Sequence, residues 1–124
     1  MNPLSKKGNQ FNPDIILDQK TGNLSIKGKS IPLSTDTFLS DVIQWIEQYS
    51  VEPSDATSLE IDLKYMNGSS IRTLLGILYR MKAISDSGKY VKVEWTIPSD
   101  AEDLQELSQK ILLSLDIPYN ISLN

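Results

Sequence analysis

Apolar and polar residues alternate along five segments of the chain, and this period of two is typical of strands that bury one face. In the clearest segment Leu59, Ile61, Leu63 and Tyr65 share a predicted apolar face, up to Met66. The others are residues 14–17 and 24–28, joined as a hairpin by turn residues 19–22, and residues 90–97 and 119–123. Because every segment except residues 14–17 alternates cleanly, we expect helices over one face of the sheet and water or a partner over the other.

Three further segments repeat their apolar residues every three or four positions, which is the period of an amphipathic helix. These stripes run from Phe38 to Tyr49, from Ile71 to Met81 and from Leu104 to Leu112. The predicted caps are Ser34 and Thr35 for the first helix, Asn67 and Gly88 for the second, and Ser99 with Glu102 as a capping box for the third. Both tryptophans, Trp45 and Trp95, fall on apolar faces, so we assign them to the core.

The predicted order of elements is β-β-α-β-α-β-α-β. Strand-helix-strand units favour parallel pairing through right-handed crossovers, whereas a hairpin is antiparallel. The sequence therefore predicts an α/β fold with a mixed five-stranded sheet and helices packed on one face. Residues 1–13 are polar and contain two prolines, so we expect a flexible N-terminal tail there and a single domain over residues 14–124.

The absence of histidine and cysteine from the 124 residues excludes several kinds of chemistry. Disulfides, imidazole or thiolate metal ligands, cysteine nucleophiles and Ser-His-Asp triads are all impossible. Asp100, Glu102, Asp103 and Glu106 could hold a divalent cation through oxygen, but acidic residues in a first helical turn usually complement the helix dipole. We therefore expect no metal and no cofactor.

Charged residues also fall on the polar face of two predicted strands: Glu60, Asp62, Lys64, Lys92 and Glu94. Acid-base catalysis by these carboxylates would need a cleft and shifted pKa values. The simpler interpretation is a solvated face with cross-strand ion pairs. We therefore expect no catalytic residues, and a small carboxylate or metal enzyme is only the third of three hypotheses.

The formal net charge of −4 and the pI near 4.7 disfavour nucleic acids and anionic membranes as partners, because phosphate binding normally needs clustered lysine and arginine. No apolar run approaches the length of a transmembrane helix, and the first thirteen residues lack the apolar stretch of a signal peptide. We expect a cytoplasmic protein whose partner is another protein.

One segment, Asn67-Gly68-Ser69-Ser70-Ile71-Arg72, places hydroxyl groups where a strand ends and a helix begins. A phosphate there would meet free backbone amides and the positive end of the helix dipole. At about 100° per residue, Ser69 points directly away from the core, Ser70 lies on the flank and Gly68 leans partly inward.

Ser69 is therefore the first candidate phosphoacceptor and Ser70 the second. The predicted partner-binding residues are Asn67, Gly68, Ser69 and Arg72. The alternative interpretation is that Asn67 is an ordinary N-cap and that the serines are first-turn residues without a signalling role.

Several separated motifs resemble the SiaC family of bacterial regulatory phosphoproteins. They are the run from Gly22 to Pro32, the run from Phe38 to Trp45, and the segment from Asn67 to Arg72. The similarity extends from about Ile15 to the C-terminus. The element order and the strand-hydroxyl-helix segment also resemble the STAS-type fold of anti-sigma factor antagonists, which carry a phosphorylatable serine at the same structural place.

The resemblance implies a partner-switching module of bacterial signalling without catalysis of its own. In such a system a Ser/Thr kinase phosphorylates the protein and a PP2C-type phosphatase reverses this. The unmodified form binds and activates a diguanylate cyclase, which makes cyclic di-GMP, a signal in biofilm regulation.

The sequence departs from the family pattern at two places. The family reads Asn-Thr-Ser-Ser with the threonine as principal phosphoacceptor, and Gly68 stands at that position here. The family's Glu-Asn after Ile-Pro is replaced by Leu33-Ser34. Two functions stay open: a phosphorylation-controlled binding protein whose acceptor has moved to Ser69, and a constitutive protein-interaction domain that has lost the switch.

Overall fold

The computed structural model describes residues 1–31 and 38–124. Its strands are β1 (Leu4–Lys6), β2 (Asp14–Asp18), β3 (Asn23–Ser30), β4 (Ala56–Met66), β5 (Tyr90–Ile97) and β6 (Tyr119–Leu123). Its helices are α1 (Phe38–Val51), α2 (Gly68–Asp86) and α3 (Glu102–Leu115). The predicted caps Ser34 and Thr35, and the departure at Leu33-Ser34, lie outside the described residues.

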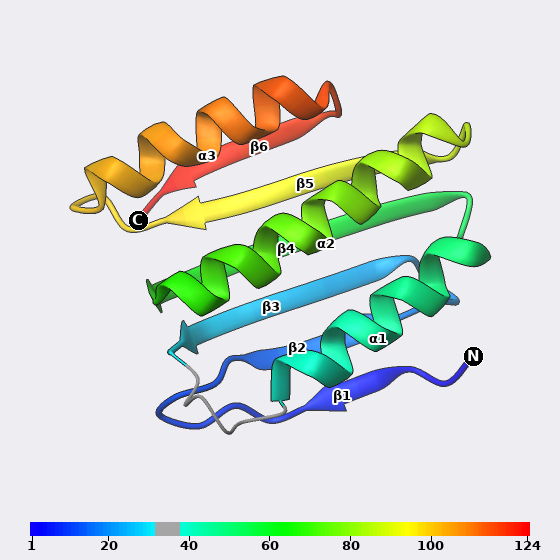
Figure 1. Ribbon diagram of the computed structural model, residues 1–124, viewed down its shortest axis with the longest axis horizontal. Coiled ribbons are helices and arrows are strands. Elements are labelled where there is room, and N and C mark those ends of the chain that lie inside the picture. Colours follow the sequence, from blue (N-terminus) through cyan, green and yellow to red (C-terminus); the bar gives the residue numbers. More distant parts are fainter. Residues whose placement is uncertain (32–37) are drawn as a thin grey trace.

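The strands form one mixed sheet in the order in which they occur along the chain. β1, β2 and β3 pair antiparallel, whereas β3, β4, β5 and β6 pair parallel. The helices connect the parallel strands and lie on the same face of the sheet (Figure 1). The predicted α/β fold, with a mixed sheet and helices on one face, is confirmed.

The sheet has six strands rather than the predicted five. The additional strand is β1, which pairs Leu4 with Leu17 and Lys6 with Ile15. It lies in the segment that the sequence predicted as a flexible tail, so residues 4–6 belong to the sheet and that prediction is wrong for them. An edge strand is held by backbone hydrogen bonds, and a three-residue strand is too short to show an apolar pattern.

Two further hydrogen bonds hold the N-terminal segment against the rest of the fold. The indole N–H of Trp45 in α1 donates to the carbonyl oxygen of Asn2 at 2.9 Å. The backbone N–H of Ile31 donates to the carbonyl oxygen of Phe11 at 2.8 Å. The segment before β2 is therefore attached both to a helix and to the residue that follows β3.

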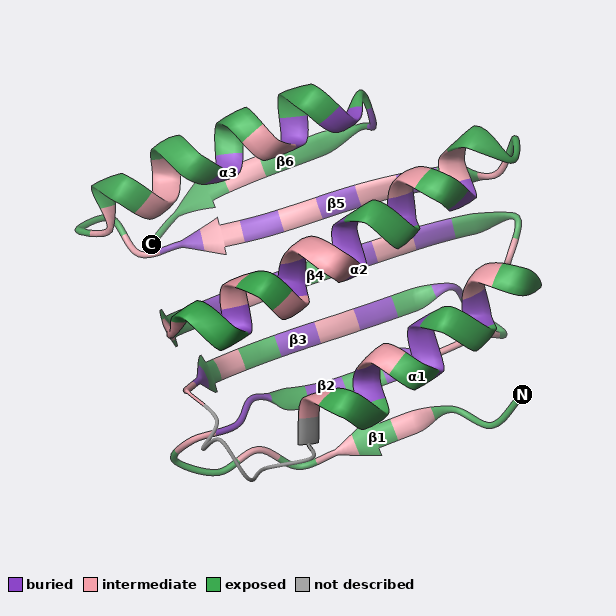
Figure 2. Cartoon of the chain, in the orientation of Figure 1, coloured by how far each residue is buried: buried purple, intermediate pink, exposed green. Residues whose placement is uncertain are grey.

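The core lies between the helices and the inner face of the sheet, and buried residues alternate with others along the central strands (Figure 2). Trp45 and Trp95 are 7% and 2% exposed, as their positions on apolar faces predict. The buried apolar side chains of the strands are Ile15, Leu17, Leu24, Ile26, Leu59, Ile61, Leu63, Val91, Val93, Trp95 and Ile97. Since the sheet is covered on one face only, its other face carries charged and polar side chains together with the exposed Ile16.

Of the predicted helix caps, the one at the end of α2 agrees with the structure and the one at the start of α3 does not. Gly88, which follows the C-cap residue Ser87 of α2, has a φ of +100°, which glycine adopts without strain. α3 begins after Ala101 and has no side-chain cap, so the predicted capping box of Ser99 and Glu102 is wrong. The backbone N–H of Ser99 instead donates to the carbonyl oxygen of Asn124 at 3.0 Å, which extends the sheet.

No helix among residues 1–31 and 38–124 is long and apolar enough to span a lipid bilayer.

The role of β1 predicts the effect of a truncation. Removing residues 1–7 eliminates the β1 pairing and the hydrogen bond of Trp45, and we expect the free energy of unfolding to fall by about 2 kcal/mol or more. Urea unfolding followed by tryptophan fluorescence measures this. Ser5→Ala, an exposed position on the same strand, is the control and should unfold like the wild type. A truncated protein with the wild-type midpoint would show that β1 contributes nothing to stability.

Candidate functional site

The segment from Tyr65 to Arg72 lies where β4 ends and α2 begins, at the edge of the sheet formed by the carboxyl ends of the parallel strands (Figure 1). Asn67 caps α2 in an extended conformation, with φ −100° and ψ 176°. Its side-chain oxygen accepts the backbone N–H of Ser70 at 3.0 Å, and its carbonyl oxygen accepts that of Ile71 at 3.0 Å. The predicted capping role of Asn67 is therefore confirmed.

Ser70 is 3% exposed and cannot be reached from solvent. Its hydroxyl donates to the carbonyl oxygen of Ser30, the last residue of β3, and lies 2.7 Å from the Ser30 hydroxyl. Because a hydroxyl has one proton, the Ser30 hydroxyl must donate in the second contact. The predicted flank position of Ser70 is wrong, since helical phase takes no account of the end of β3 beneath the first turn. A phosphate on Ser70 would require these hydrogen bonds to break.

Ser69 and Gly68 are both exposed. This agrees with the predicted orientation of Ser69 and corrects that of Gly68, which was expected to lean inward. A Cβ atom built on Gly68 would meet only the Arg72 Nη1 atom, at 3.5 Å, and Gly68 is not among the residues with positive φ. The backbone therefore does not require glycine here, and the missing hydroxyl is a difference of chemistry rather than of conformation.

Tyr65 lies on the opposite face of the sheet from the one that its alternation predicts. Gly28 of β3 pairs with Leu63 and Lys29 pairs with Tyr65, so that Lys64 is an extra residue in β4. Such a bulge shifts every following side chain to the other face. Tyr65 is consequently 60% exposed instead of joining the apolar face with Leu63, and Met66 packs against the core in its place.

An open groove of about 590 Å³ runs from the end of β4 to the start of α3. Its apolar part comes from Met66, Ile71, Leu104 and Leu107, and its rim from Lys64, Tyr65, Asp100, Glu102 and Asp103. The groove leaves no pattern in the sequence, because one wall lies at residues 64–71 and the other at residues 100–107. Among the described residues, no three acidic side chains are grouped so that they could hold a metal ion.

The open face of the sheet carries ion pairs, one between strands, as predicted, and one within a strand. Lys27 of β3 contacts Glu60 of β4 at 2.8 Å, and Lys92 contacts Glu94 within β5 at 2.7 Å. The hydrogen bond from Lys92 holds the pKa of Glu94 below its usual value. A general acid needs a raised pKa, so this carboxylate is arranged for ion pairing rather than for proton donation.

Comparison with known proteins then decides the family. The family model of the SiaC family regulatory phosphoprotein matches residues 6–123. The chain belongs to the SiaC family. The resemblance drawn from its sequence motifs is thereby confirmed, and the matched segment extends farther towards the N-terminus than those motifs do.

Relatives of the chain come from Pseudomonas aeruginosa. An uncharacterized protein of strain UCBPP-PA14 is 28% identical over 98% of this chain and 96% of its own length. The crystal structure of apo-SiaC matches with a TM-score of 0.84 and 28% identity, over 98% of this chain and 99% of that one. The crystal structure of the diguanylate cyclase SiaD in complex with its activator SiaC matches with a TM-score of 0.86 and 27% identity, over 98% and 99%.

Substitution of the two serines should affect the stability of the protein differently. Ser70→Ala leaves the buried hydroxyl of Ser30 without its partner, so we expect the free energy of unfolding to fall by about 1 to 3 kcal/mol. Ser69→Ala removes an exposed hydroxyl and should change it by less than about 0.5 kcal/mol. Chemical denaturation of both variants measures the difference, and equal stabilities would contradict the hydrogen-bonded role of Ser70.

Proposed function

We propose that this protein is a non-enzymatic regulator that binds a diguanylate cyclase and is switched by phosphorylation of Ser69. The main support is the similarity, over nearly the whole of both chains, to the structure in which SiaC is the activator of the cyclase SiaD. Membership of a family of regulatory phosphoproteins supports the phosphorylation part of the proposal.

Ser69 is the proposed acceptor because its surroundings suit a phosphate. It is exposed in the first turn of α2, where backbone N–H groups and the helix dipole favour negative charge. Arg72 follows one turn later. Its guanidinium has no ion pair among the described residues and could therefore contact a phosphate. Ser70, whose hydroxyl is buried and hydrogen-bonded, is the weaker candidate.

A phosphate on Ser69 adds about −1.5 to −2 charges to the surface around Asn67, Gly68 and Arg72. A partner that docks there would be repelled or would have to desolvate the phosphate. The unmodified form is therefore the binding form in this proposal, and phosphorylation releases the cyclase.

The remaining parts of the system follow from the family resemblance. We propose a Ser/Thr kinase that modifies the protein, a PP2C-type phosphatase that restores it, and a cytoplasmic pathway whose output is cyclic di-GMP. Partner switching of this kind also occurs in the STAS-type anti-sigma factor antagonists, which the element order resembles.

A constitutive interaction domain is the second candidate function, and Gly68 is the observation that favours it. A chain that had lost its phosphoacceptor could keep the fold and the partner surface while binding permanently. The two candidates differ only in whether Ser69 is modified and whether its charge affects binding.

Mass spectrometry of the protein from its own host tests the switch directly. We expect a phosphorylated form that fragmentation across residues 65–72 assigns to Ser69, and that is absent from Ser69→Ala. Gly68→Thr, which the space at this position accommodates, should add a second site if the kinase recognises the family's usual position. Absence of phosphate under all growth conditions would favour the constitutive domain.

Binding to the host diguanylate cyclase most similar to SiaD tests the consequence. Ser69→Asp should weaken binding by about tenfold, equivalent to about 1.4 kcal/mol, whereas Ser69→Ala should bind like the wild type. Ser114→Asp, at an exposed serine of α3, adds the same charge elsewhere and should have no effect. Equal capture of the cyclase by all of these variants would support constitutive binding instead.

A further inference from the structure

Most cations of this protein are neutralised by a neighbouring acid. Within the described residues, seven of the twelve lysines and arginines form ion pairs: Lys6, Lys27, Arg80, Lys82, Lys89, Lys92 and Lys110. The other five have no ion pair within the described residues: Lys7, Lys20, Lys29, Lys64 and Arg72. Because the chain has more carboxylates than cations, every cation could have an ion-pair partner. The positions of these five can therefore indicate where the protein binds an anionic group of a partner.

Four of the five lie at the same end of the sheet, where β3 and β4 end and α2 begins. Lys7, Lys29 and Lys64 line one hollow of about 380 Å³, together with Lys27 and, among the described residues, the carboxylate of Asp14. Lys27 is paired with Glu60, and Asp14 accepts the backbone N–H of Gly8 at 2.7 Å. We call Lys7, Lys29, Lys64 and Arg72 the basic corner.

Arg72 joins the basic corner to the proposed phosphorylation site. Its Nη1 atom lies 3.5 Å from the place where a Cβ on Gly68 would be, directly before Ser69 in the chain. Lys64 is the extra residue of the β4 bulge, and the same bulge brings out Tyr65. The bulge therefore places an exposed lysine and an exposed aromatic ring beside the start of α2.

Tyr65 gives the basic corner an anchor for a protein partner. Its ring is 60% exposed and lies 5.4 Å from the Lys29 ammonium group. Exposed tyrosine and arginine side chains are the residue types that contribute most to protein interfaces. Charge alone would suit any anion. The aromatic ring adds apolar contact area that a protein segment can bury, and the net charge of −4 disfavours a nucleic acid.

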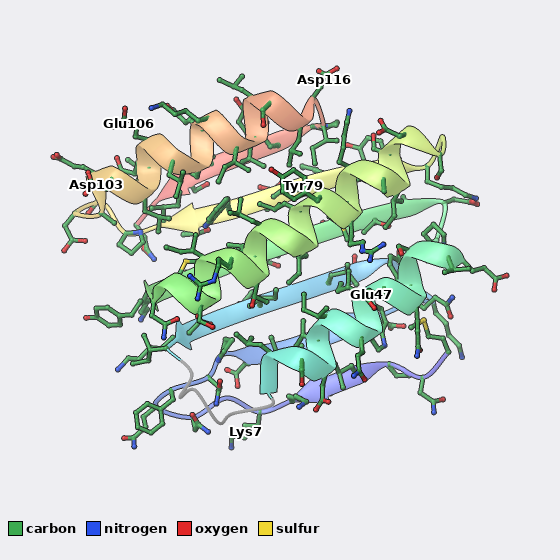
Figure 3. The ribbon with its side chains drawn as sticks, in the orientation of Figure 1. Lys7, Glu47, Tyr79, Asp103, Glu106 and Asp116 are labelled. Atoms are coloured by element: carbon green, nitrogen blue, oxygen red, sulfur yellow. The ribbon has the colours of Figure 1, made fainter. Side chains whose placement is uncertain are left out.

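The opposite side of the start of α2 has the opposite charge. Asp100, Glu102 and Asp103, at the start of α3, line the same groove as Lys64 and Tyr65. Figure 3 shows Lys7 and Asp103 on either side of the start of α2. A bound acidic segment would be repelled from the α3 side and attracted to the basic corner, so the charge pattern also orients the partner.

We propose that the basic corner is the docking surface for an acidic segment of the protein's target, with Tyr65 at its centre. This inference rests on the proposed function and explains why phosphorylation would weaken binding of the target. A phosphate on Ser69 lies beside Arg72, cancels part of the positive charge and repels the acidic segment. Phosphorylation would strengthen the binding of a basic target, so an acidic target is the one that this switch releases.

Matched charge reversals test the proposal. Lys64→Glu and Lys20→Glu each change the net charge by the same amount, and both remove an exposed lysine that has no ion pair in the described residues. Lys20 lies in the turn between β2 and β3, away from the basic corner. We expect Lys64→Glu to weaken binding of the host cyclase by about tenfold, mainly through slower association, and Lys20→Glu to change it less than about twofold.

Two further measurements test whether a loss of binding comes from the charge of the basic corner. Binding of the wild type should weaken as salt is raised, and Lys64→Glu should show a smaller salt dependence. Adding Ser69→Asp to Lys64→Glu should cost less than adding it to the wild type, since both act on the same charge. Lys7→Glu is a second variant, and thermal unfolding of each variant verifies its fold.

The outcomes distinguish this inference from the proposed function. If the wild type binds the cyclase but Lys64→Glu and Lys7→Glu bind equally well, the basic corner is not the docking surface, although the proposed function stands. An effect of Lys20→Glu on cyclase binding as large as that of Lys64→Glu would also overturn the docking proposal, because net charge alone would explain both.

Two other outcomes concern the kind of partner. If the wild type binds phosphatidylserine vesicles, and Lys64→Glu abolishes this binding without changing cyclase binding, the basic corner is a membrane-binding surface. Failure of the wild type to bind any diguanylate cyclase would refute both proposals.

Discussion

The hydrogen bonds between Ser70 and Ser30 determine how the site is presented. They join the first turn of α2 to the end of β3, and Asn67 adds a cap on the same turn. With Ser70 held inward, the rotation of the helix about its axis is fixed. Gly68 and Ser69 must then face solvent, and the charge of a phosphate would be placed outside the fold rather than within it.

The bulge in β4 has a comparable effect on the neighbouring surface. An extra residue at Lys64 moves Tyr65 from the inner face to the outer one and leaves Met66 against the core. One irregularity of pairing therefore converts the end of a core strand into part of an exposed surface. This surface adjoins the start of α2, so that a modification there and a partner docked there would influence each other.

The overall charge of the protein says little about that surface. The chain is acidic, yet four cations that have no ion pair among residues 1–31 and 38–124 gather at the end of the sheet where β3 and β4 end and α2 begins, and acidic side chains line the start of α3. Interactions between charges in water fall off within about 8 to 10 Å at ordinary salt concentrations. A partner therefore responds to the local group of charges and not to the net value, which is why a single phosphate can have a large effect at one place.

The amino-acid sequence by itself determined the class of fold, most of the strands and helices, the cap at Asn67, the exposed position of Ser69 and the family. These properties depend on local periodicity and on motifs within short segments. Only the tertiary structure decided the sixth strand, the burial of Ser70, the outward turn of Tyr65 and the grouping of lysines at one end of the sheet. Each depends on contacts between segments far apart in the chain: β1 with β2, Ser30 with Ser70, Lys29 with Tyr65. Helical phase and strand alternation describe one element at a time, and they carry no information about which neighbour it will meet.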